Sequence, residues 1–366
     1  MSEWILKEEE RVAFSLRALY EKYGYLPYKM SKFEEYDLYM RNKEVLVGDG
    51  VITFNDTDGK LLALKPDVTL SIIKNHADEQ GKRKVYYHES VYRVSEQTKQ
   101  FKEVTQVGLE CLGEIDLYDT YETVCLALKS LSLVSQNFVV DISHLGLLTA
   151  VLENLSVGAE FTEKVKTSLY RKNAQGLVSL CEEYGVGEEI KSALQVLVNA
   201  YGESEKVLKM LQPVAEKYAK EEYARLQALC GLLAQTEYAD KIRLDFSVEN
   251  SRNYYNDVVF KGYVEGISES VLSGGRYDKL TQRMGKQSGA IGFAVYLDLL
   301  EDLKQNQRKT DVDILLLYDE KTSKTELVQK AEALIKDGNS VRVQKTADGV
   351  RYEKLVDMRG GAICVC

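Results

Sequence analysis

Three things are scarce in this chain of 366 residues, and each scarcity argues against a class of protein. No apolar run approaches the roughly 18 to 20 residues that a membrane-spanning helix needs, so we expect no membrane segment. Cysteine pairs with C-x-x-C spacing are absent, and the three histidines have no ligand spacing to any cysteine, which argues against a disulfide framework or a metal site. The six cysteines are Cys111, Cys125, Cys181, Cys230, Cys364 and Cys366.

Positive charge is the third scarcity. The chain has 48 Lys and Arg against 57 Asp and Glu, a net charge of −9. Because nucleic-acid binding draws most of its affinity from neutralising phosphates, tRNA is a poor partner for such a chain.

The first residues are acidic where a signal peptide needs a basic region, so we expect a cytoplasmic protein. None of His76, His88 and His144 falls in a motif, and we interpret them as packing or surface residues.

Periodicity defines the organisation of the chain. Alternation of apolar and polar residues from Tyr86 to Tyr92, and again from Val104 to Leu112, predicts a long antiparallel hairpin. A helix is predicted near 33–41, a hairpin turn at 56–59, and an almost wholly helical insertion over about 148–236. Strands are expected at 242–248 and 254–263, and the small residues of 289–294 predict a strand that runs into a Leu-rich helix.

Five separated segments carry a family resemblance. They are Leu64–Thr69, Val91–Arg93, Gln106–Glu110, Tyr254–Phe260 and Gly274–Asp278. In this order they resemble the motifs of the catalytic domain of class II aminoacyl-tRNA synthetases, most closely histidyl-tRNA synthetase, over roughly residues 8 to 300. The resemblance implies an α+β fold in which an antiparallel sheet is flanked by helices. It implies a core over 1–305 and, over 310–366, a small α/β domain like a shortened anticodon-binding domain.

The same resemblance implies an amino-acid pocket. In that family, the matching positions hold the α-amino group and the imidazole of histidine, and tyrosines close over the ring. Carboxylates suit an ammonium group, and a tyrosine offers an apolar face with a polar tip. The histidine-binding residues implied here are Asp67, Thr69, Gln106, Glu110, Tyr255 and Tyr277.

Departures from the family pattern fall on the groups that handle phosphates. The third motif of a synthetase ends in Gly-Phe-Ala-x-Gly-Leu-Glu-Arg, whereas this chain has Leu299 at the arginine position. The arginine that precedes the Tyr-Tyr signature aligns with Asn250, although a shift of register would let Arg252 replace it. Because adenylyl transfer depends on positioned positive charge, two lost arginines predict no amino-acid activation. Arg93 has two readings, a phosphate contact or a structural salt bridge.

A histidine pocket without its catalyst resembles the regulatory-subunit family of ATP phosphoribosyltransferase. The resemblance implies a non-catalytic homodimer, assembled with the short-form catalytic subunit of that enzyme and binding L-histidine as a feedback effector. No cofactor and no tRNA are implied. Two alternatives remain open: an active but divergent histidyl-tRNA synthetase or amino-acid ligase, and a stand-alone histidine-binding module with another partner.

Overall fold

The computed structural model describes residues 7–42, 50–78, 81–94, 98–155, 158–248, 255–302, 310–361 and 364–365. The chain forms two compact units, Met1–Leu303 and Lys304–Cys366. The first unit contains a nine-stranded and a three-stranded sheet, the second contains a four-stranded sheet, and each unit has buried apolar clusters of its own. In the described residues no helix combines the length and apolar character needed to cross a membrane.

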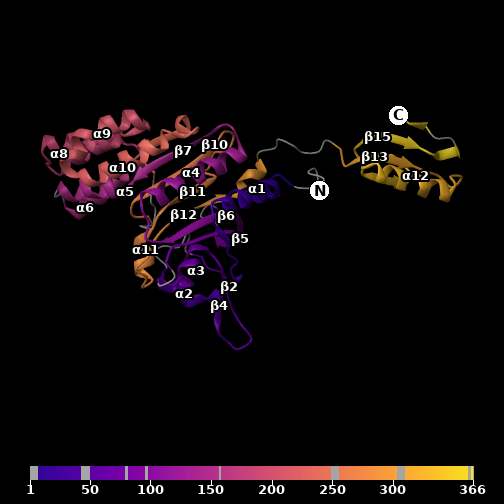
Figure 1. Ribbon diagram of the computed structural model, residues 1–366, viewed down its shortest axis with the longest axis horizontal. Helices are drawn as coiled ribbons and strands as arrows, with labels where there is room; N and C mark the ends of the chain where they lie inside the picture. The colour runs from indigo at the N-terminus through magenta and orange to yellow at the C-terminus, as the bar shows by residue number, and fades with distance from the viewer. Residues whose placement is uncertain are drawn as a thin grey trace. The chain divides into compact units, whose positions relative to one another are not determined.

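A nine-stranded sheet forms the frame of the first unit (Figure 1). Two of its neighbouring pairs, β1 with β5 and β7 with β9, are parallel, and the others are antiparallel. In spatial order the strands are β1 (Leu26–Pro27), β5 (Arg83–Val94), β6 (Phe101–Gly113), β12 (Gly289–Tyr296), β11 (Leu272–Arg276), β10 (Val258–Val264), β7 (Phe138–His144), β9 (Ile242–Asp245) and β8 (Tyr201–Glu203).

Helices α1 (Glu8–Lys22) and α4 (Leu117–Val134) cover one face of this sheet, which we call the helix-covered face. Their apolar residues join one core with alternate residues of the strands, including Leu109 of β6, Phe260 of β10 and Phe293 of β12. Because side chains alternate along a strand, the residues between these point to the opposite face, which we call the pocket face. This alternation places each motif residue on one side of the sheet or the other.

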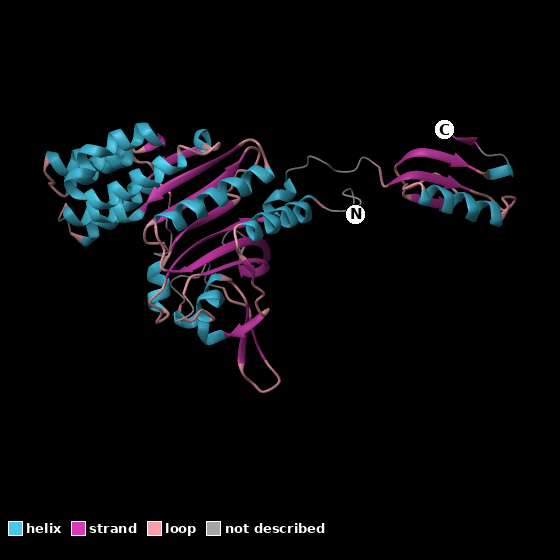
Figure 2. Ribbon diagram, in the orientation of Figure 1, coloured by secondary structure: helices cyan, strands magenta, loops and turns pink. Residues whose placement is uncertain are grey.

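The helical insertion begins directly at the end of β7. Figure 2 shows it as a group of helices at one end of the sheet, and its Leu-rich sequence packs into the same core as α1 and α4. The insertion also contains the short edge strand β8. Its helices are α5 (Leu145–Asn154), α6 (Ala159–Tyr170), α7 (Ala174–Glu183), α8 (Glu188–Val198), α9 (Ser204–Tyr218) and α10 (Lys220–Leu233), followed by a 3₁₀ turn, η4 (Ala239–Lys241).

A smaller three-stranded sheet lies beside the hairpin of β5 and β6. It has the order β2 (Phe33–Glu35), β4 (Leu61–Leu64), β3 (Thr53–Asn55). Short helices α2 (Tyr36–Arg41), α3 (Thr69–Lys74) and α11 (Asp278–Arg283) complete this region. The buried side chains of α3 join a second apolar cluster with Tyr87 and Tyr277, so the strand-to-helix segment that contains Asp67 is packed against the hairpin.

The second unit is a small α/β layer. Strands β14 (Val341–Gln344), β13 (Val312–Leu317) and β15 (Tyr352–Asp357) are parallel, and β16 (Cys364–Val365) pairs antiparallel with β15. Helix α12 (Lys324–Lys336) packs Leu327 against Ile314 and Leu316, and a 3₁₀ turn, η6 (Arg359–Gly361), precedes β16.

The sequence-based expectations are confirmed in outline and wrong in some boundaries. The α+β fold, the long hairpin, the turn at 56–59 and the helical insertion are confirmed. The helix expected over 33–41 begins only at Tyr36, because Phe33–Glu35 pair with β4. The strand expected to reach Val248 ends at Asp245, whose side chain accepts hydrogen bonds from Ser247 and forms a turn.

One further boundary, one helix type and one strand differ from the expectation. The strand expected from Tyr254 begins at Val258. The Leu-rich helix after β12 is a 3₁₀ helix, η5 (Leu297–Asp302). Strand β15 was not predicted, because its sequence, Tyr-Glu-Lys-Leu-Val-Asp, has neither a clean alternation nor a continuous apolar run.

Candidate functional site

Glu110 lies at the centre of the pocket face. It comes from β6, which is paired on both sides, and only 3% of the residue is exposed. Thr69, at the start of α3, donates a hydrogen bond of 2.9 Å to Oε1, and the hydroxyl of Tyr277 donates a hydrogen bond to Oε2. Burial raises the pKa of Glu110 to about 8, although both hydrogen bonds act to lower it. The carboxyl group is therefore mostly protonated at neutral pH in this state.

Two glycines make room for the side chains of the pocket. A Cβ on Gly292 would lie 1.7 Å from Oε2 of Glu110 and 2.3 Å from the Leu109 carbonyl oxygen. A Cβ on Gly275 would lie 2.7 Å from the ring of Tyr255 and 2.6 Å from a backbone carbonyl. Real side-chain atoms do not approach so closely, so β12 and the segment Gly274–Asp278 need glycine at these positions to let the two side chains lie flat on the sheet.

Asp67 and Arg93 lie next to each other at the rim of the same face. Arg93 donates from Nε to the Pro66 carbonyl oxygen at 2.7 Å, and its Nη2 is 3.7 Å from Oδ2 of Asp67. Asp67 in turn accepts the backbone N–H of Leu70, which fixes the first turn of α3. Burial raises the pKa of Asp67, and the guanidinium of Arg93 opposes this rise. Arg93 thus has the geometry of the structural salt bridge.

The six residues expected to bind histidine gather on or beside the pocket face. Thr69, Glu110 and Tyr277 are in direct contact. Gln106 is buried and lies four residues before Glu110 on β6, so both side chains leave the same face. Tyr255 lies in the loop before β10, over Gly275, and the negative charges of Glu110 and Asp67 contribute to a raised pKa of its hydroxyl, after the larger effect of burial.

Three further residues of this face were not predicted. Tyr87 is buried on β5 with its hydroxyl directly above Gly108, where a Cβ would be 2.4 Å from Oη. Ser273 and Tyr296 share a hydrogen bond of 2.8 Å between their hydroxyl groups. Tyr296 also influences the raised pKa values of Tyr87 and Tyr255. The alternation of side chains along β5 could have identified Tyr87, because it lies six residues before Arg93 and therefore on the same face of the sheet.

Of the two positions at which the family's arginines are lost, the structure describes one. Leu299 lies in η5 and packs against the main core, so an apolar side chain is built into the structure there. Asn250 lies outside the described residues, together with Arg252 and Tyr254. The loss of the arginine at Asn250 therefore stays a prediction, and the alternative that Arg252 replaces it stays open.

Among the described residues, the site brings two buried carboxyl groups together with several tyrosines. Asp67 and Glu110 both have raised pKa values, which means that burial of their charge is only partly compensated by the protein. A ligand that carries an ammonium group would supply the missing positive charge. Tyrosine faces beside these carboxyl groups suit a flat polar ring.

This sheet, its helical insertion and the residues gathered around Glu110 define a domain of the class II aminoacyl-tRNA synthetase fold. The family described as histidyl-tRNA synthetase matches residues 5–300. The chain belongs to this family, and the resemblance carried by the five segments is confirmed.

Relatives and solved structures refine the comparison. An ATP phosphoribosyltransferase regulatory subunit of Acetivibrio thermocellus is 27% identical over 340 residues, which cover 90% of this chain and 81% of the relative. An ATP phosphoribosyltransferase regulatory subunit/histidyl-tRNA synthetase from Bacillus halodurans has a TM-score of 0.77 at 23% identity, over 99% of this chain and 96% of the other. The ATP phosphoribosyl transferase (HisG:HisZ) complex from Thermotoga maritima matches with a TM-score of 0.63 at 18% identity, over 79% of this chain and 97% of that chain.

Proposed function

We propose that this protein is the regulatory subunit of an ATP phosphoribosyltransferase and binds L-histidine in the pocket around Glu110. The observation that carries the proposal is the pair of buried carboxyl groups, Asp67 and Glu110, with raised pKa values beside tyrosine rings. The α-ammonium group of histidine would lie against these carboxylates and restore their ionisation. The hydroxyls of Thr69 and Tyr277 would hold Glu110 in place for it.

The protein does not catalyse amino-acid activation on this proposal. Leu299 packs against the core where a synthetase has the arginine of its third motif. Tyr296 stands where the same motif has glycine, and its side chain occupies part of the pocket face beside Ser273. A large side chain at a glycine position removes room for a second ligand next to histidine. Both changes favour sensing over adenylate formation.

The partner on this proposal is the short-form catalytic subunit of ATP phosphoribosyltransferase. The relative from Acetivibrio thermocellus bears the name of the regulatory subunit, and a similar fold occurs in the complex from Thermotoga maritima. We further propose that the protein is a cytoplasmic homodimer within a hetero-oligomer, that it activates the catalytic subunit, and that it needs neither a cofactor nor tRNA. Residues 310–366 would be a shortened descendant of an anticodon-binding domain.

The first experiment is isothermal titration of the whole protein with L-histidine, alongside a histidine-dependent pyrophosphate-exchange assay. Binding without exchange is the expected result. Exchange would mean that the chain is a divergent synthetase or amino-acid ligase, and absence of binding would remove the effector role. Reconstitution with a short catalytic subunit then decides between a regulatory subunit and a stand-alone histidine-binding module, because only the former restores histidine-sensitive phosphoribosyl transfer.

A further inference from the structure

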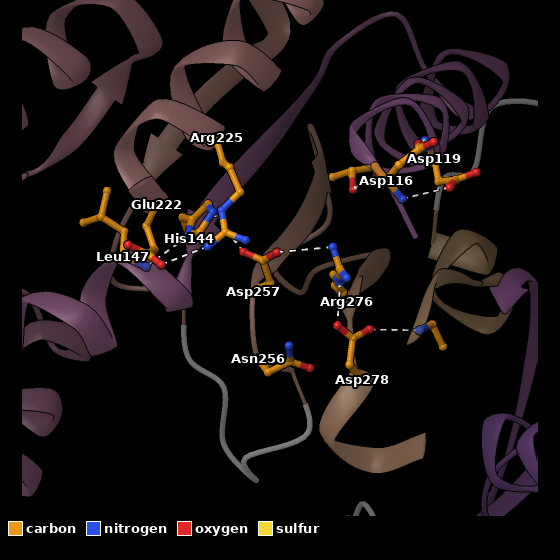
Figure 3. Close-up of polar contacts among 12 residues, drawn as sticks. Asp116, Asp119, His144, Leu147, Glu222, Arg225, Asn256, Asp257, Arg276 and Asp278 are labelled. Atoms are coloured by element: carbon orange, nitrogen blue, oxygen red, sulfur yellow. Dashed lines mark hydrogen bonds and ion pairs between the residues drawn. The ribbon is translucent and has the colours of Figure 1, made fainter. Parts of the chain in front are cut away.

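A cavity lies away from the residues of the proposed histidine site, where the insertion helix α10 meets the sheet and the start of α4. Its volume is about 460 Å³, which falls in the usual range for small-molecule sites. Figure 3 shows the charged side chains around it, with Arg225, His144 and Asp257 together and Arg276 next to them. The apolar part of the lining is Ile115, Leu117, Ala224, Ala228, Leu229 and Val258.

This cavity is on the helix-covered face. His144 and Val258 are paired in the sheet and both line it, as does Arg276 at the end of β11. The next residue, Tyr277, instead reaches Glu110 on the pocket face. Consecutive residues of an extended segment point to opposite faces, so one backbone step separates a cavity residue from a residue of the proposed histidine pocket.

A chain of polar contacts links the insertion to this backbone step. The backbone N–H of Leu147 donates to Nδ1 of His144 at 3.0 Å and begins α5, so Nδ1 carries no proton and Nε2 carries the proton of the neutral ring. Nε2 is 2.9 Å from Oδ1 of Asp257, whose Oδ2 is 3.6 Å from Nη1 of Arg276. Nε of Arg276 donates to Asp278 at 2.7 Å (Figure 3). A displacement of Arg276 would therefore disturb its contacts with both Asp257 and Asp278, the first of which leads to His144 and α5.

The carboxylates of the cavity are already engaged by protein groups. Asp257 contacts His144 and Arg276, and its pKa is lowered by His144, Arg276 and Arg225 despite burial. Asp116 accepts the N–H of Asp119 as the cap of α4. Oδ1 of Asp257 has no aligned hydrogen-bond donor within the described residues, but His144, Arg276 and Arg225 surround this carboxylate and balance its negative charge.

The guanidinium groups, by contrast, have donors to spare. Arg225 contacts Glu222 at 2.8 Å on its own helix, and its side chain is 59% exposed. Arg276 contacts Asp257 and Asp278. Each guanidinium carries five N–H donors, and both side chains line the cavity, so these contacts within the described residues leave several donors for a ligand. The complementary group is a carboxylate or a phosphate, which arginine binds through two donors at once.

We propose that this cavity is a second binding site, for a small molecule that joins a carboxylate or phosphate to an apolar or ring-shaped body. Arg225 and Arg276 hold the anionic group. Ala224 and Ala228, one turn apart on α10, leave space for the body between α10 and α4. The molecule would change histidine affinity through Arg276 and Tyr277, and this coupling, unlike the site itself, rests on the proposed function.

The test uses the whole protein and four probes with the same ring: phenyl phosphate, benzoate, benzyl alcohol and benzylamine. Binding is followed by protein-observed NMR, first for the unaltered chain and then for two variants. Arg225→Gln removes one of the two guanidinium groups that would hold the anion, and Ala228→Phe fills the cavity. Arg171→Gln is the matched control, since Arg171 is exposed and does not line the cavity.

At least one anionic probe should bind, and whether phenyl phosphate or benzoate binds more tightly distinguishes a phosphate ligand from a carboxylate. Affinity should fall at least about tenfold in Arg225→Gln and in Ala228→Phe, and stay unchanged in Arg171→Gln. Equal binding of benzyl alcohol or benzylamine, equal binding by Arg225→Gln, or no binding of either anion would overturn the proposed site.

A histidine titration with and without the bound probe separates the two proposals. A change of at least about threefold in histidine affinity supports the coupling, and by linkage histidine changes probe affinity by the same factor. An unchanged histidine affinity overturns the coupling and leaves the site. Probe binding in a protein that does not bind histidine overturns the proposed function alone.

Discussion

Thr69 donates a hydrogen bond of 2.9 Å to Oε1 of Glu110 across 41 residues of sequence. This contact joins the first turn of α3 to the middle of β6. With Tyr277 on the other carboxyl oxygen, Glu110 has a fixed orientation before any ligand arrives. A preorganised group of this kind loses little conformational entropy on binding, which favours a tight and selective site.

Replacement of Glu110 by alanine should weaken histidine binding by about 10- to 100-fold, because a hydrogen bond to a charged group contributes roughly 1.5 to 3 kcal/mol. Titration calorimetry measures this change directly. Glu114→Ala, at an exposed position just after β6, is the control and should bind as the unaltered protein does. If the two variants bind histidine equally well, the ligand does not lie against Glu110.

Histidine binding should release a proton near pH 7. Without ligand the pKa of Glu110 is about 8, so its carboxyl group is mostly protonated, and an ammonium group beside it would lower that pKa. The release should disappear well above pH 8, where the free protein has already lost the proton. Calorimetry in buffers of different ionisation enthalpy counts the protons.

The control for proton release is Glu110→Gln, which has no proton to lose at this position. It removes the contribution of Glu110 and leaves that of the imidazole of histidine itself. An identical proton count in Glu110→Gln and in the unaltered protein would contradict the raised pKa.

The sequence predicts the sheet face of a residue better than it predicts the neighbours of that residue. Motif spacing leads to Glu110 and Gln106, and alternation along β6 places them together. Tyr296 and Ser273 were missed because their contact depends on the register between β11 and β12, which is set by tertiary packing. His144 was interpreted as a packing or surface residue, and its contact with Asp257 depends on the pairing of β7 with β10.

Local propensity also fails where a distant strand takes part. Residues Phe33–Glu35 continue into α2 by sequence pattern, yet they form a strand because β4 offers backbone partners. Leu299 illustrates the opposite case. The sequence alone shows that Leu299 replaces the arginine of the family motif. An apolar side chain at this position is expected to be buried, and Leu299 does pack against the core.

The buried ion pair of Lys65 and Glu89 should be costly to break. Lys65 is 2% exposed at its side chain and Glu89 15%, and Oε1 of Glu89 also accepts the N–H of Met30. Lys65→Met leaves a buried carboxylate without its cation, which should lower the free energy of unfolding by about 3 to 5 kcal/mol. Urea denaturation measures the loss.

Two comparisons sharpen this experiment. The double variant Lys65→Met, Glu89→Leu should recover much of the lost stability, since it removes both charges. Lys209→Met breaks the exposed pair with Glu205, in which the two side chains are 72% and 81% exposed, and should cost at most about 1 kcal/mol. Equal losses in the two single variants would show that burial of Lys65 does not decide the effect.

Gly292 and Gly231 give a matched pair of glycine substitutions with opposite expected signs. A Cβ at Gly292 would meet Glu110 and the backbone of Leu109, which cannot move without distorting the β6–β12 ladder. Gly292→Ala should therefore destabilise the protein by about 1 to 3 kcal/mol and abolish histidine binding. Gly231 lies inside α10 with no atom within 4 Å of an added Cβ, so Gly231→Ala should raise stability by up to about 1 kcal/mol and leave binding unchanged. Thermal unfolding with and without histidine measures both effects, and a Gly292→Ala protein that is still stabilised by histidine would mean that the ligand does not depend on the position of Glu110.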